Sequence, residues 1–294
     1  MIVVAANPYS GAADNRRRVD ELARELAALA GPLRVLWDAR ERAALLADRA
    51  AMASCRVVVA AGGDGTVAQV INELPSGTPL AVFPAGTENL FAATHGFADE
   101  PIALARAVAA GRTRALDLGR ASVTGRHRLF ALMLSAGLDA EIVRRLAKWR
   151  DSGAALRRVR RVSYVAHIAA SLAGYRHPPV RVLAGETAAS GAYCIIANAP
   201  AYALDVPLTP QARADDGALD WVVFERGGLA ALATYSWAVW RGRHLERGDV
   251  RVGRATRLTL DAAAPVPVQV DGDPLGTTPV EVQVMPGALT LIAP

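Results

Sequence analysis

The chain has 294 residues, of which 52% are hydrophobic and 21% charged, so it can form a sizeable core and is not a wholly disordered protein. Its formal net charge of +5 favours anionic partners such as nucleotides and phospholipid surfaces. Cys55 and Cys194 lie far apart and outside any CxxC motif or Cys/His cluster. This argues against a structural zinc site and fits a reducing cytoplasm.

Membrane-related signals are weak along the sequence. Residues 1–8 lack the basic and apolar pattern of a secretory signal. The longest apolar stretches, 163–175 and 229–240, are shorter than the ~18–20 residues that a membrane-spanning helix needs. We therefore expect a cytoplasmic protein that is at most peripheral to a membrane.

The first third of the chain alternates strand and helix patterns. Apolar runs predict strands over 2–6, 33–37, 56–61 and 80–85. Capping signals and helical spacing predict helices that begin at Asp14 and at about Asn89, and others over 41–53, 66–74 and 101–110. This order implies a parallel sheet with helices on both faces, in an α/β domain that we place at residues 1–119.

The pattern changes after residue 119, where short alternating segments predict an antiparallel β domain over 120–285. The expected strands cover 193–198, 219–224, 257–261, 266–270, 280–284 and 289–292. Helical patterns over about 140–173 and 229–243 interrupt them. We expect the two domains to pack closely, with a cleft between them.

Three loops that follow predicted parallel strands contain Gly together with Ser or Thr. They are Asn7-Pro8-Tyr9-Ser10-Gly11, Gly62-Gly63-Asp64-Gly65-Thr66 and Pro84-Ala85-Gly86-Thr87-Glu88-Asn89. The carboxyl ends of parallel strands meet at one edge of a sheet, where backbone N–H groups can approach phosphate oxygens. The loops predict a phosphate site that is neither a Walker A loop nor a GxGxxG fingerprint.

Asp64 lies inside this predicted phosphate site. A carboxylate that faces phosphates would repel them, so a bridging Mg²⁺, bound directly or through water, is one interpretation. An Asp in a Gly-rich turn is also a common turn former or helix cap. Both interpretations stay open on the sequence alone.

Two further acidic segments are candidate sites. Asp271 and Asp273 lie two residues apart, which on a strand places both carboxylates on one face for proton transfer or Mg²⁺ binding. The alternative is an exposed hairpin turn. Asp215-Asp216-Gly217 is either a turn or part of a metal site.

A basic segment lies within the predicted helix over 140–173. Its members are Arg144, Arg145, Lys148, Arg150, Arg157, Arg158, Arg160 and Arg161, with Trp149 among them. Such a segment, 144–161, predicts transient docking on an anionic membrane, and the alternative is a solvated helix face. Aromatic residues make up only 5% of the chain and no known motif is present, so we do not expect nucleic-acid binding.

The three loops together resemble the diacylglycerol kinase catalytic-domain family, which includes bacterial soluble diacylglycerol and lipid kinases and sphingosine kinases. Later segments resemble the same family in the same order. They are FALMLSAGLDAE at 130–141, DDGALD at 215–220, VDGDP at 270–274 and the closing segment 286–294. The resemblance departs from the family at Ala68 and Leu132, where an Asn is usual, and at Leu90, where an Asp often follows the Asn.

The resemblance implies an α/β nucleotide-binding domain followed by a β-sandwich that binds lipid, with the strand at about 286–294 returning to the first domain. It implies ATP as phosphoryl donor and Mg²⁺ as cofactor. The acceptor it implies is a lipid hydroxyl, that of diacylglycerol or a related lipid. Nucleotide contacts would fall on Asn7, Pro8, Tyr9, Ser10, Gly11, Gly62, Gly63, Asp64, Gly65, Thr66, Val67, Ala68 and Thr87.

The resemblance also assigns the acidic segments. Asp273 matches the proposed proton acceptor, a Glu in the family, and Asp271 is the second candidate. A structural Mg²⁺ would be held by Asp216 and by the backbone carbonyls of Arg213 and Ala218. A homodimer is compatible with the resemblance. An NAD kinase-like enzyme, which also uses GGDG, and a non-catalytic lipid- or nucleotide-binding protein are the alternatives.

Overall fold

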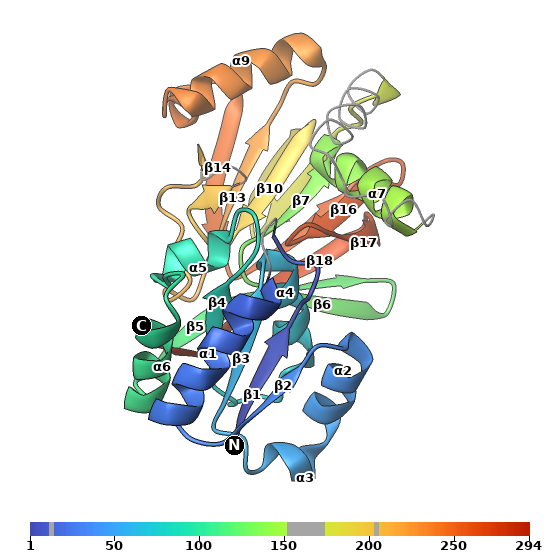
Figure 1. Ribbon diagram of the computed structural model, residues 1–294. Helices are drawn as coiled ribbons and strands as arrows, with labels where there is room; N and C mark the ends of the chain where they lie inside the picture. The colour runs from blue at the N-terminus through green and yellow to red at the C-terminus, as the bar shows by residue number, and fades with distance from the viewer. Residues whose placement is uncertain (12–14, 152–173, 203–205) are drawn as a thin grey trace.

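The structure is a computed structural model that describes residues 1–294 except 12–14, 152–173 and 203–205. Within these residues the strands form a ten-stranded sheet, a six-stranded sheet and a two-stranded ribbon. The α/β half lies at one end of the molecule and the β-sandwich half at the other (Figure 1). The predicted order of an α/β domain followed by an antiparallel β-sandwich is confirmed.

The α/β half is built on parallel strands in the order β2-β1-β3-β4. Their bounds are β1 (Ile2–Ala6), β2 (Leu33–Leu36), β3 (Val57–Gly62) and β4 (Leu80–Pro84). β1, β3 and β4 are continuous buried apolar runs, as expected where helices cover both faces of a sheet.

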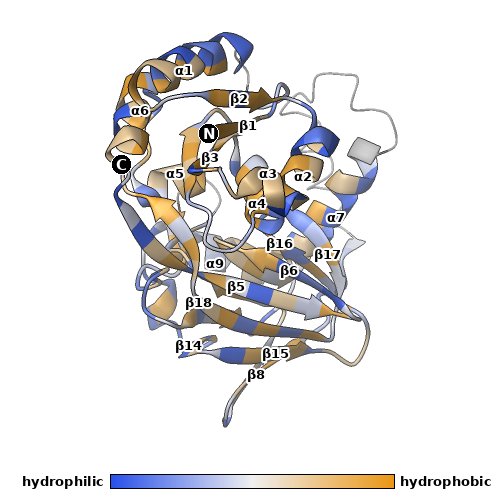
Figure 2. Cartoon of the chain, turned by 90° about the horizontal axis from the view of Figure 1, so that it is seen from below, coloured by the Kyte–Doolittle hydropathy of each residue, from blue (hydrophilic) through white to orange (hydrophobic). Residues whose placement is uncertain are grey.

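Six helices surround these strands in the described part of this half. They are α1 (Asn15–Leu29), α2 (Ala39–Ala47), α3 (Arg49–Met52), α4 (Asp64–Glu73), α5 (Leu90–His95) and α6 (Pro101–Ala110). Figure 2 shows α1 and α6 on one face of the sheet and α2 to α4 on the other. The predicted helix over 41–53 is two helices, because the carboxylate of Asp48 caps the N-terminus of α3.

The sandwich half packs antiparallel strands of the long sheet against the six-stranded sheet. The long sheet contributes β5 (Thr113–Val123), β6 (Arg126–Phe130), β8 (Val180–Ala184), β9 (Thr187–Gly191), β15 (Arg257–Asp261) and β18 (Val280–Ile292). The second sheet has the order β14-β13-β10-β7-β16-β17. Its bounds are β7 (Met133–Gly137), β10 (Tyr193–Ala197), β13 (Leu219–Phe224), β14 (Val250–Ala255), β16 (Pro267–Val270) and β17 (Asp273–Thr277).

The remaining elements lie around the sandwich. They are α7 (Leu138–Asp151), the ribbon β11 (Ala201–Tyr202) and β12 (Val206–Pro207), α9 (Leu229–Trp240) and the short η3 (His244–Glu246). Residues 152–173 of the predicted helix over 140–173 lie outside the described residues. Within the described residues, no helix is both long and apolar enough to cross a membrane.

β18 is one strand where the sequence predicts two, over 280–284 and 289–292. The register of β18 against β5 shifts between Met285 and Leu289, at a bulge that contains Pro286 and Gly287. Such a bulge absorbs the residues that break the alternating pattern. Beyond it, Leu291 pairs in parallel with Leu80 of β4. β18 therefore runs from the sandwich into the α/β half, and so does β5.

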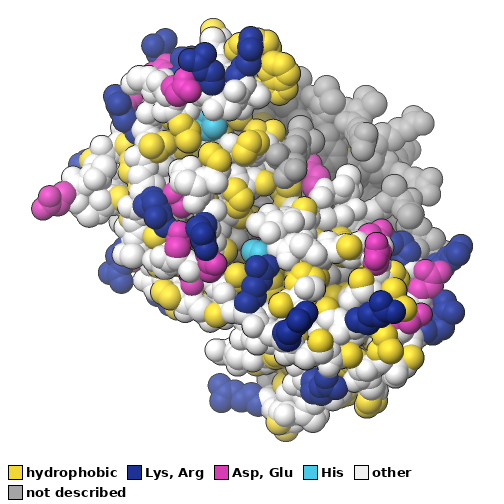
Figure 3. All heavy atoms as spheres, turned by 90° about the vertical axis from the view of Figure 1, so that its left-hand side faces the viewer, with side chains coloured by type: hydrophobic (Ala, Val, Ile, Leu, Met, Phe, Trp, Pro, Cys, Tyr) yellow, Lys and Arg dark blue, Asp and Glu magenta, His cyan; other side chains and the backbone are white. Residues whose placement is uncertain are grey.

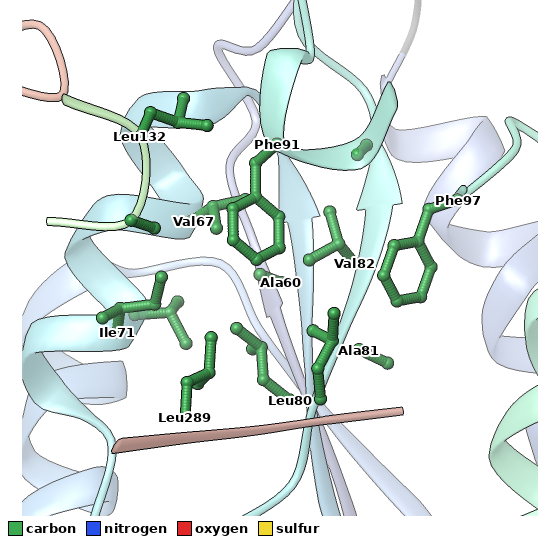
Figure 4. Close-up of a cluster of buried hydrophobic side chains, with 14 of the residues drawn as sticks. Ala60, Val67, Ile71, Leu80, Ala81, Val82, Phe91, Phe97, Leu132 and Leu289 are labelled. Atoms are coloured by element: carbon green, nitrogen blue, oxygen red, sulfur yellow. The ribbon is translucent and has the colours of Figure 1, made fainter. Parts of the chain in front are cut away.

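Two buried clusters form the core. One fills the sandwich, and the other begins in the α/β half and continues into the sandwich half. Figure 4 shows Leu132 and Leu289 among the side chains of Val67, Ile71 and Phe91. Apolar side chains from both halves therefore pack together where the halves meet.

Candidate active site

The three glycine loops, residues 7–11, 62–66 and 84–89, meet at the carboxyl ends of β1, β3 and β4. Asn7 Nδ2 donates to Thr66 Oγ1 at 3.1 Å, which joins the first loop to the second. The backbone N–H of Ala85 donates to the carbonyl of Gly62 at 3.0 Å, which joins the second loop to the third. The loops therefore form one surface.

Glycine is required where these loops touch. A Cβ on Gly86 would lie 2.4 Å from the Cα of Gly63, and a Cβ on Gly11 would lie 2.6 Å from the carbonyl oxygen of Ala85. Neither neighbour can move aside, because each is backbone. The absence of Cβ atoms lets the three backbones approach one another. The N–H of Gly86 itself donates to Asn89 Oδ1 at 2.8 Å, within the third loop.

Asp64 holds the second loop to the helix after the third. Its Oδ2 accepts from the N–H of Leu90 at 3.1 Å and its Oδ1 from that of Phe91 at 2.9 Å. Both oxygens thus satisfy free N–H groups at the start of α5. This contact fits the capping interpretation of Asp64. Each Asp64 oxygen keeps a lone pair that can accept a hydrogen bond from a water molecule bound to a cation. This arrangement fits Asp64 better than direct ligation of the cation.

The predicted nucleotide-binding residues divide by exposure. Thr66, Val67 and Ala68 are each only 3% exposed. Only their backbones could reach a nucleotide, since the Val67 side chain lies in the core and Thr66 Oγ1 accepts from Asn7. The more accessible predicted residues are Asn7, Pro8, Tyr9, Ser10, Gly11, Gly63, Asp64, Gly65 and Thr87. Gly62 is buried, and a Cβ there would meet Thr66 Oγ1 at 2.3 Å.

The acidic turn, Asp271-Gly272-Asp273, connects β16 to β17. Asp271 lies outside both strands with a φ of 45°, and Asp273 is the first residue of β17, paired with Val270. The prediction that Asp271 and Asp273 share one face of a strand was therefore wrong. Residues two apart share a face only within a continuous strand, and the left-handed conformation at Asp271 breaks that alternation.

Backbone N–H groups from the connection between β6 and β7 hold the Asp271 carboxylate. Oδ2 accepts from Ala131 at 2.7 Å, and Oδ1 accepts from Leu132 at 3.0 Å and from Met133 at 2.9 Å. Burial raises the pKa of Asp271 to about 6, although these hydrogen bonds oppose the rise. The negative charge of Asp64 contributes to the same rise in pKa.

Asp273 has a partner that the sequence did not suggest. Arg128 of β6 donates to Asp273 Oδ2 at 2.5 Å, and the side chain of each is 26% exposed. The two residues are 145 positions apart in the sequence, so no local sequence pattern predicts that they pair. Arg128 holds one oxygen of the carboxylate at the edge of the site.

Asn72 of α4 links the two halves and was also missed by sequence analysis. Its Nδ2 donates to the carbonyl of Leu129 at 2.9 Å, and its Oδ1 accepts from the N–H of Leu129 at 2.9 Å. The amide thus pairs with one residue of β6 much as a neighbouring strand would. α4, which begins at the second glycine loop, is thereby fixed to the strand that carries Arg128.

The segment around Asp216 is held by arginine and backbone donors. Arg254 Nη2 pairs with Asp216 Oδ2, and Oδ1 accepts from the N–H of Ala218 at 3.2 Å. Arg213 pairs through its side chain with Asp215. Among the described residues, no group of three or more His, Cys, Asp or Glu side chains is arranged to hold a metal. Since Arg254 already supplies positive charge at Asp216, the Mg²⁺ site at Arg213, Asp216 and Ala218 stays a prediction.

The described part of the basic segment 144–161 is partly neutralised. Arg144 and Arg145 both pair with the buried Glu141, at 2.7 and 2.6 Å. Arg157, Arg158, Arg160 and Arg161 lie outside the described residues. Membrane docking through this segment stays a prediction.

Comparison with known proteins accounts for both halves. A family model described as the diacylglycerol kinase catalytic domain matches residues 1–121, and one described as the YegS C-terminal NAD kinase beta sandwich-like domain matches residues 133–293. The chain belongs to the diacylglycerol kinase family of lipid kinases. The resemblance inferred from the sequence motifs is confirmed.

Relatives in this family cover nearly the whole chain. A Pseudomonas aeruginosa protein named "Probable lipid kinase YegS-like" is 30% identical over 279 residues, 93% of this chain and 86% of the relative. A Mycobacterium tuberculosis protein named "Diacylglycerol kinase" is 29% identical over 264 residues, 87% of this chain and 82% of the relative.

Solved structures show the same fold at lower identity. A diacylglycerol kinase from Bacillus anthracis matches with a TM-score of 0.69 and 18% identity, covering 100% of this chain and 96% of that one. An NAD kinase from Archaeoglobus fulgidus in complex with ATP matches with a TM-score of 0.55 and 12% identity, covering 99% and 93%. The lipid kinases and NAD kinases of this comparison thus share the two-part fold of this chain.

Proposed function

We propose that the protein transfers the γ-phosphoryl group of ATP to a hydroxyl of a membrane lipid, diacylglycerol or a close relative. The observation that carries the proposal is that Asp271 of the acidic turn binds the N–H of Leu132, whose side chain packs among Val67 and Phe91 of the helices that follow two of the glycine loops. Phosphoryl transfer needs a phosphate-binding surface and a proton acceptor on opposite sides of the reacting atoms. The two halves supply one each.

In this proposal the glycine loops bind the phosphates through backbone N–H groups. Asn7 and Thr66 hold the first two loops in register, and Asp64 holds the third by capping α5. Mg²⁺, when bound with ATP, offsets the negative charge of the phosphates. We assign contacts with the nucleotide to the accessible residues Ser10, Gly65 and Thr87.

We assign proton acceptance to Asp273 and a positioning role to Asp271. Three backbone N–H groups occupy the carboxylate of Asp271, which fixes the turn to the connection between β6 and β7. Asp273 has one oxygen bound by Arg128 and a partly exposed side chain. It is therefore the carboxylate better placed to meet a hydroxyl that enters the site.

The family departures are consistent with a working site. Leu132 stands where the family usually has Asn, and its side chain packs in the core between the halves. Its backbone N–H donates to Asp271. Ala68 is buried and its carbonyl accepts from Asn72 Nδ2 at 2.9 Å. Both positions therefore contribute backbone hydrogen bonds and apolar packing.

The test is transfer of radiolabel from [γ-³²P]ATP to lipid in vesicles that contain diacylglycerol, monoacylglycerol or ceramide, with NAD as a separate acceptor. We expect a labelled lipid product that requires Mg²⁺ and is absent with Asp273→Asn. Labelled NADP in place of labelled lipid would favour the NAD kinase-like alternative. No product with any acceptor would favour a non-catalytic binding protein.

A further inference from the structure

Helix α9 presents an apolar face to solvent on the sandwich half. Its twelve residues, LAALATYSWAVW, include no charged side chain, and only Tyr235 and Ala238 are buried. Leu229 is 57%, Trp237 57% and Trp240 71% exposed. With Ala233, these residues fall at helical spacing on one side of the helix, which we call the α9 face. Exposure of two tryptophans on one helix marks an interaction site.

Arginines border the α9 face. Arg241 lies over the ring of Trp237, 4.9 Å from its centroid, and the rings of Trp237 and Trp240 are 5.0 Å apart. Residues 225–251 contain five arginines and three acidic residues, a net charge of +2. Figure 3 shows hydrophobic and basic side chains together at the top of the molecule, the end that α9 occupies in Figure 1.

We propose that the α9 face docks the protein on the surface of an anionic phospholipid bilayer. Tryptophan rings bury their apolar part at the level of lipid headgroups, and arginines beside them bind lipid phosphates. A twelve-residue helix is too short to span the bilayer, so α9 lies along its surface. The excess of positive charge selects an anionic membrane.

A second copy of the chain fits the α9 face less well. The helix is about 18 Å long and about 10 Å wide, so its footprint is about 180 Å². A stable protein interface buries about 800 Å² on each partner. An extended bilayer has no such area requirement, because affinity comes from a few inserted side chains and from charge.

The α9 face is connected to the candidate active site through the β11–β12 ribbon. α9 contacts β12, β12 pairs with β11, and β11 contacts α5. The N-terminus of α5 is the one that Asp64 caps. Docking through α9 would thus hold the sandwich half, which carries the acidic turn, at the surface of the bilayer.

The test is sedimentation of the full chain with vesicles of phosphatidylglycerol and phosphatidylcholine in equal parts, without ATP. We expect Trp237→Ser/Trp240→Ser to raise the vesicle Kd by about tenfold or more. The matched control is Leu29→Ser/Ile102→Ser, which removes two similarly exposed apolar side chains from the α/β half. Thermal unfolding of both variants checks that they fold. Unchanged binding by the tryptophan variant would overturn the proposal.

Brominated phospholipid in the vesicles gives a second readout, because bromine quenches tryptophans that enter the bilayer. We expect strong quenching of the wild type and little in Trp237→Phe/Trp240→Phe, which keeps Trp37, Trp149 and Trp221. Equal quenching in both would place the membrane contact at another tryptophan and overturn the α9 assignment. A dimer that Trp237→Ser/Trp240→Ser converts to a monomer without vesicles would assign the face to a second copy.

The vesicle result is separable from the reaction. The enzyme can reach detergent-dispersed diacylglycerol without docking on a bilayer. If the proposed function holds, the Trp237→Ser/Trp240→Ser variant should therefore phosphorylate this substrate at the wild-type rate. Wild-type protein that binds vesicles but labels no lipid would refute the kinase proposal alone. Protein that labels dispersed lipid but does not bind anionic vesicles would refute the docking proposal alone.

Discussion

The glycine loops and the acidic turn form the two sides of the candidate site in different ways. Each glycine loop is one continuous stretch in which a strand, a turn and, for two of them, a helix follow directly. The Asp271 carboxylate, in contrast, is held by backbone groups 138 to 140 residues earlier in the chain. Local sequence thus specifies the glycine loops, whereas the position of the acidic turn is specified only once the sandwich has folded.

The largest expected effect separates the two carboxylates of the acidic turn. Asp273→Asn should lower kcat by about 10²–10⁴-fold, the usual contribution of a general base, with little change in unfolding temperature. Asp271→Asn should instead destabilise the fold, by about 1–3 kcal/mol, because one of the oxygens that accept backbone N–H groups is lost. Steady-state kinetics and urea unfolding measure the two effects. Comparable activity loss in the two variants with unchanged stability would contradict the division of roles.

The next effect tests the close approach of the glycine loops. Gly86→Ala places a Cβ against the backbone of Gly63 and should cost about 1–3 kcal/mol of stability while raising the KM for ATP. Gly65→Ala is the control, since its Cβ would meet nothing within 4 Å and the residue lies in α4. Gly65→Ala should be neutral or stabilising by up to ~1 kcal/mol. Equal stability of the two variants would show that the loops do not need to touch.

The role of Asp64 as a helix cap can be tested separately from its role in the candidate site. Asp64→Asn should cost about 1 kcal/mol of stability and most of the kinase activity. Asp48→Asn is the matched control, because Asp48 also accepts from two backbone N–H groups at a helix N-terminus, that of α3. One oxygen of Asp48 accepts both bonds, and the amide oxygen of Asn can do the same, so we expect a smaller stability loss there and full activity. Full activity of Asp64→Asn would reduce Asp64 to a cap.

The last effect is the pH dependence of stability, which involves no change in activity. The pKa of Asp271 is raised in the folded state to about 6, so the folded protein binds this proton more tightly than the unfolded chain. The contribution of this group to stability is therefore greatest below about pH 4 and falls by about 1–3 kcal/mol as pH rises to about 6. Urea unfolding at pH 4 and pH 7, wild type against Asp271→Asn, isolates it. A pH-independent difference between the two proteins would contradict the raised pKa.

Much of the fold was predictable because its signals are local. The apolar runs of β1, β3 and β4 and the Gly-rich turns after them mark a parallel sheet and its ligand edge. The antiparallel order of the sandwich half also follows from its alternating segments. The return of the strand at about 286–294 to the first domain was expected only through the family resemblance, since no periodicity predicts it. Its pairing of Leu291 with Leu80 was not predicted.

The candidate site was less predictable in its partners than in its residues. No local motif distinguishes Arg128 or Asn72 in the sequence. Their roles arise only when folding brings β6 to the Asp273 side chain and to α4. The left-handed conformation at Asp271 was missed because Asp-Gly-Asp fits both a strand and a turn. What decided between them was the binding of its carboxylate by Ala131, Leu132 and Met133.

The continuous strand β18 has a consequence for synthesis of the protein. β4 pairs with β3 on one edge and with residue 291 of β18 on the other. On the ribosome, residues 1–110 emerge first and can begin to fold as a unit, but one edge of β4 stays unpaired until β18 has been made. An unpaired, fully apolar edge strand invites aggregation. The nascent α/β half therefore exposes the Leu80 end of this edge until β18 has been made and Leu291 pairs there.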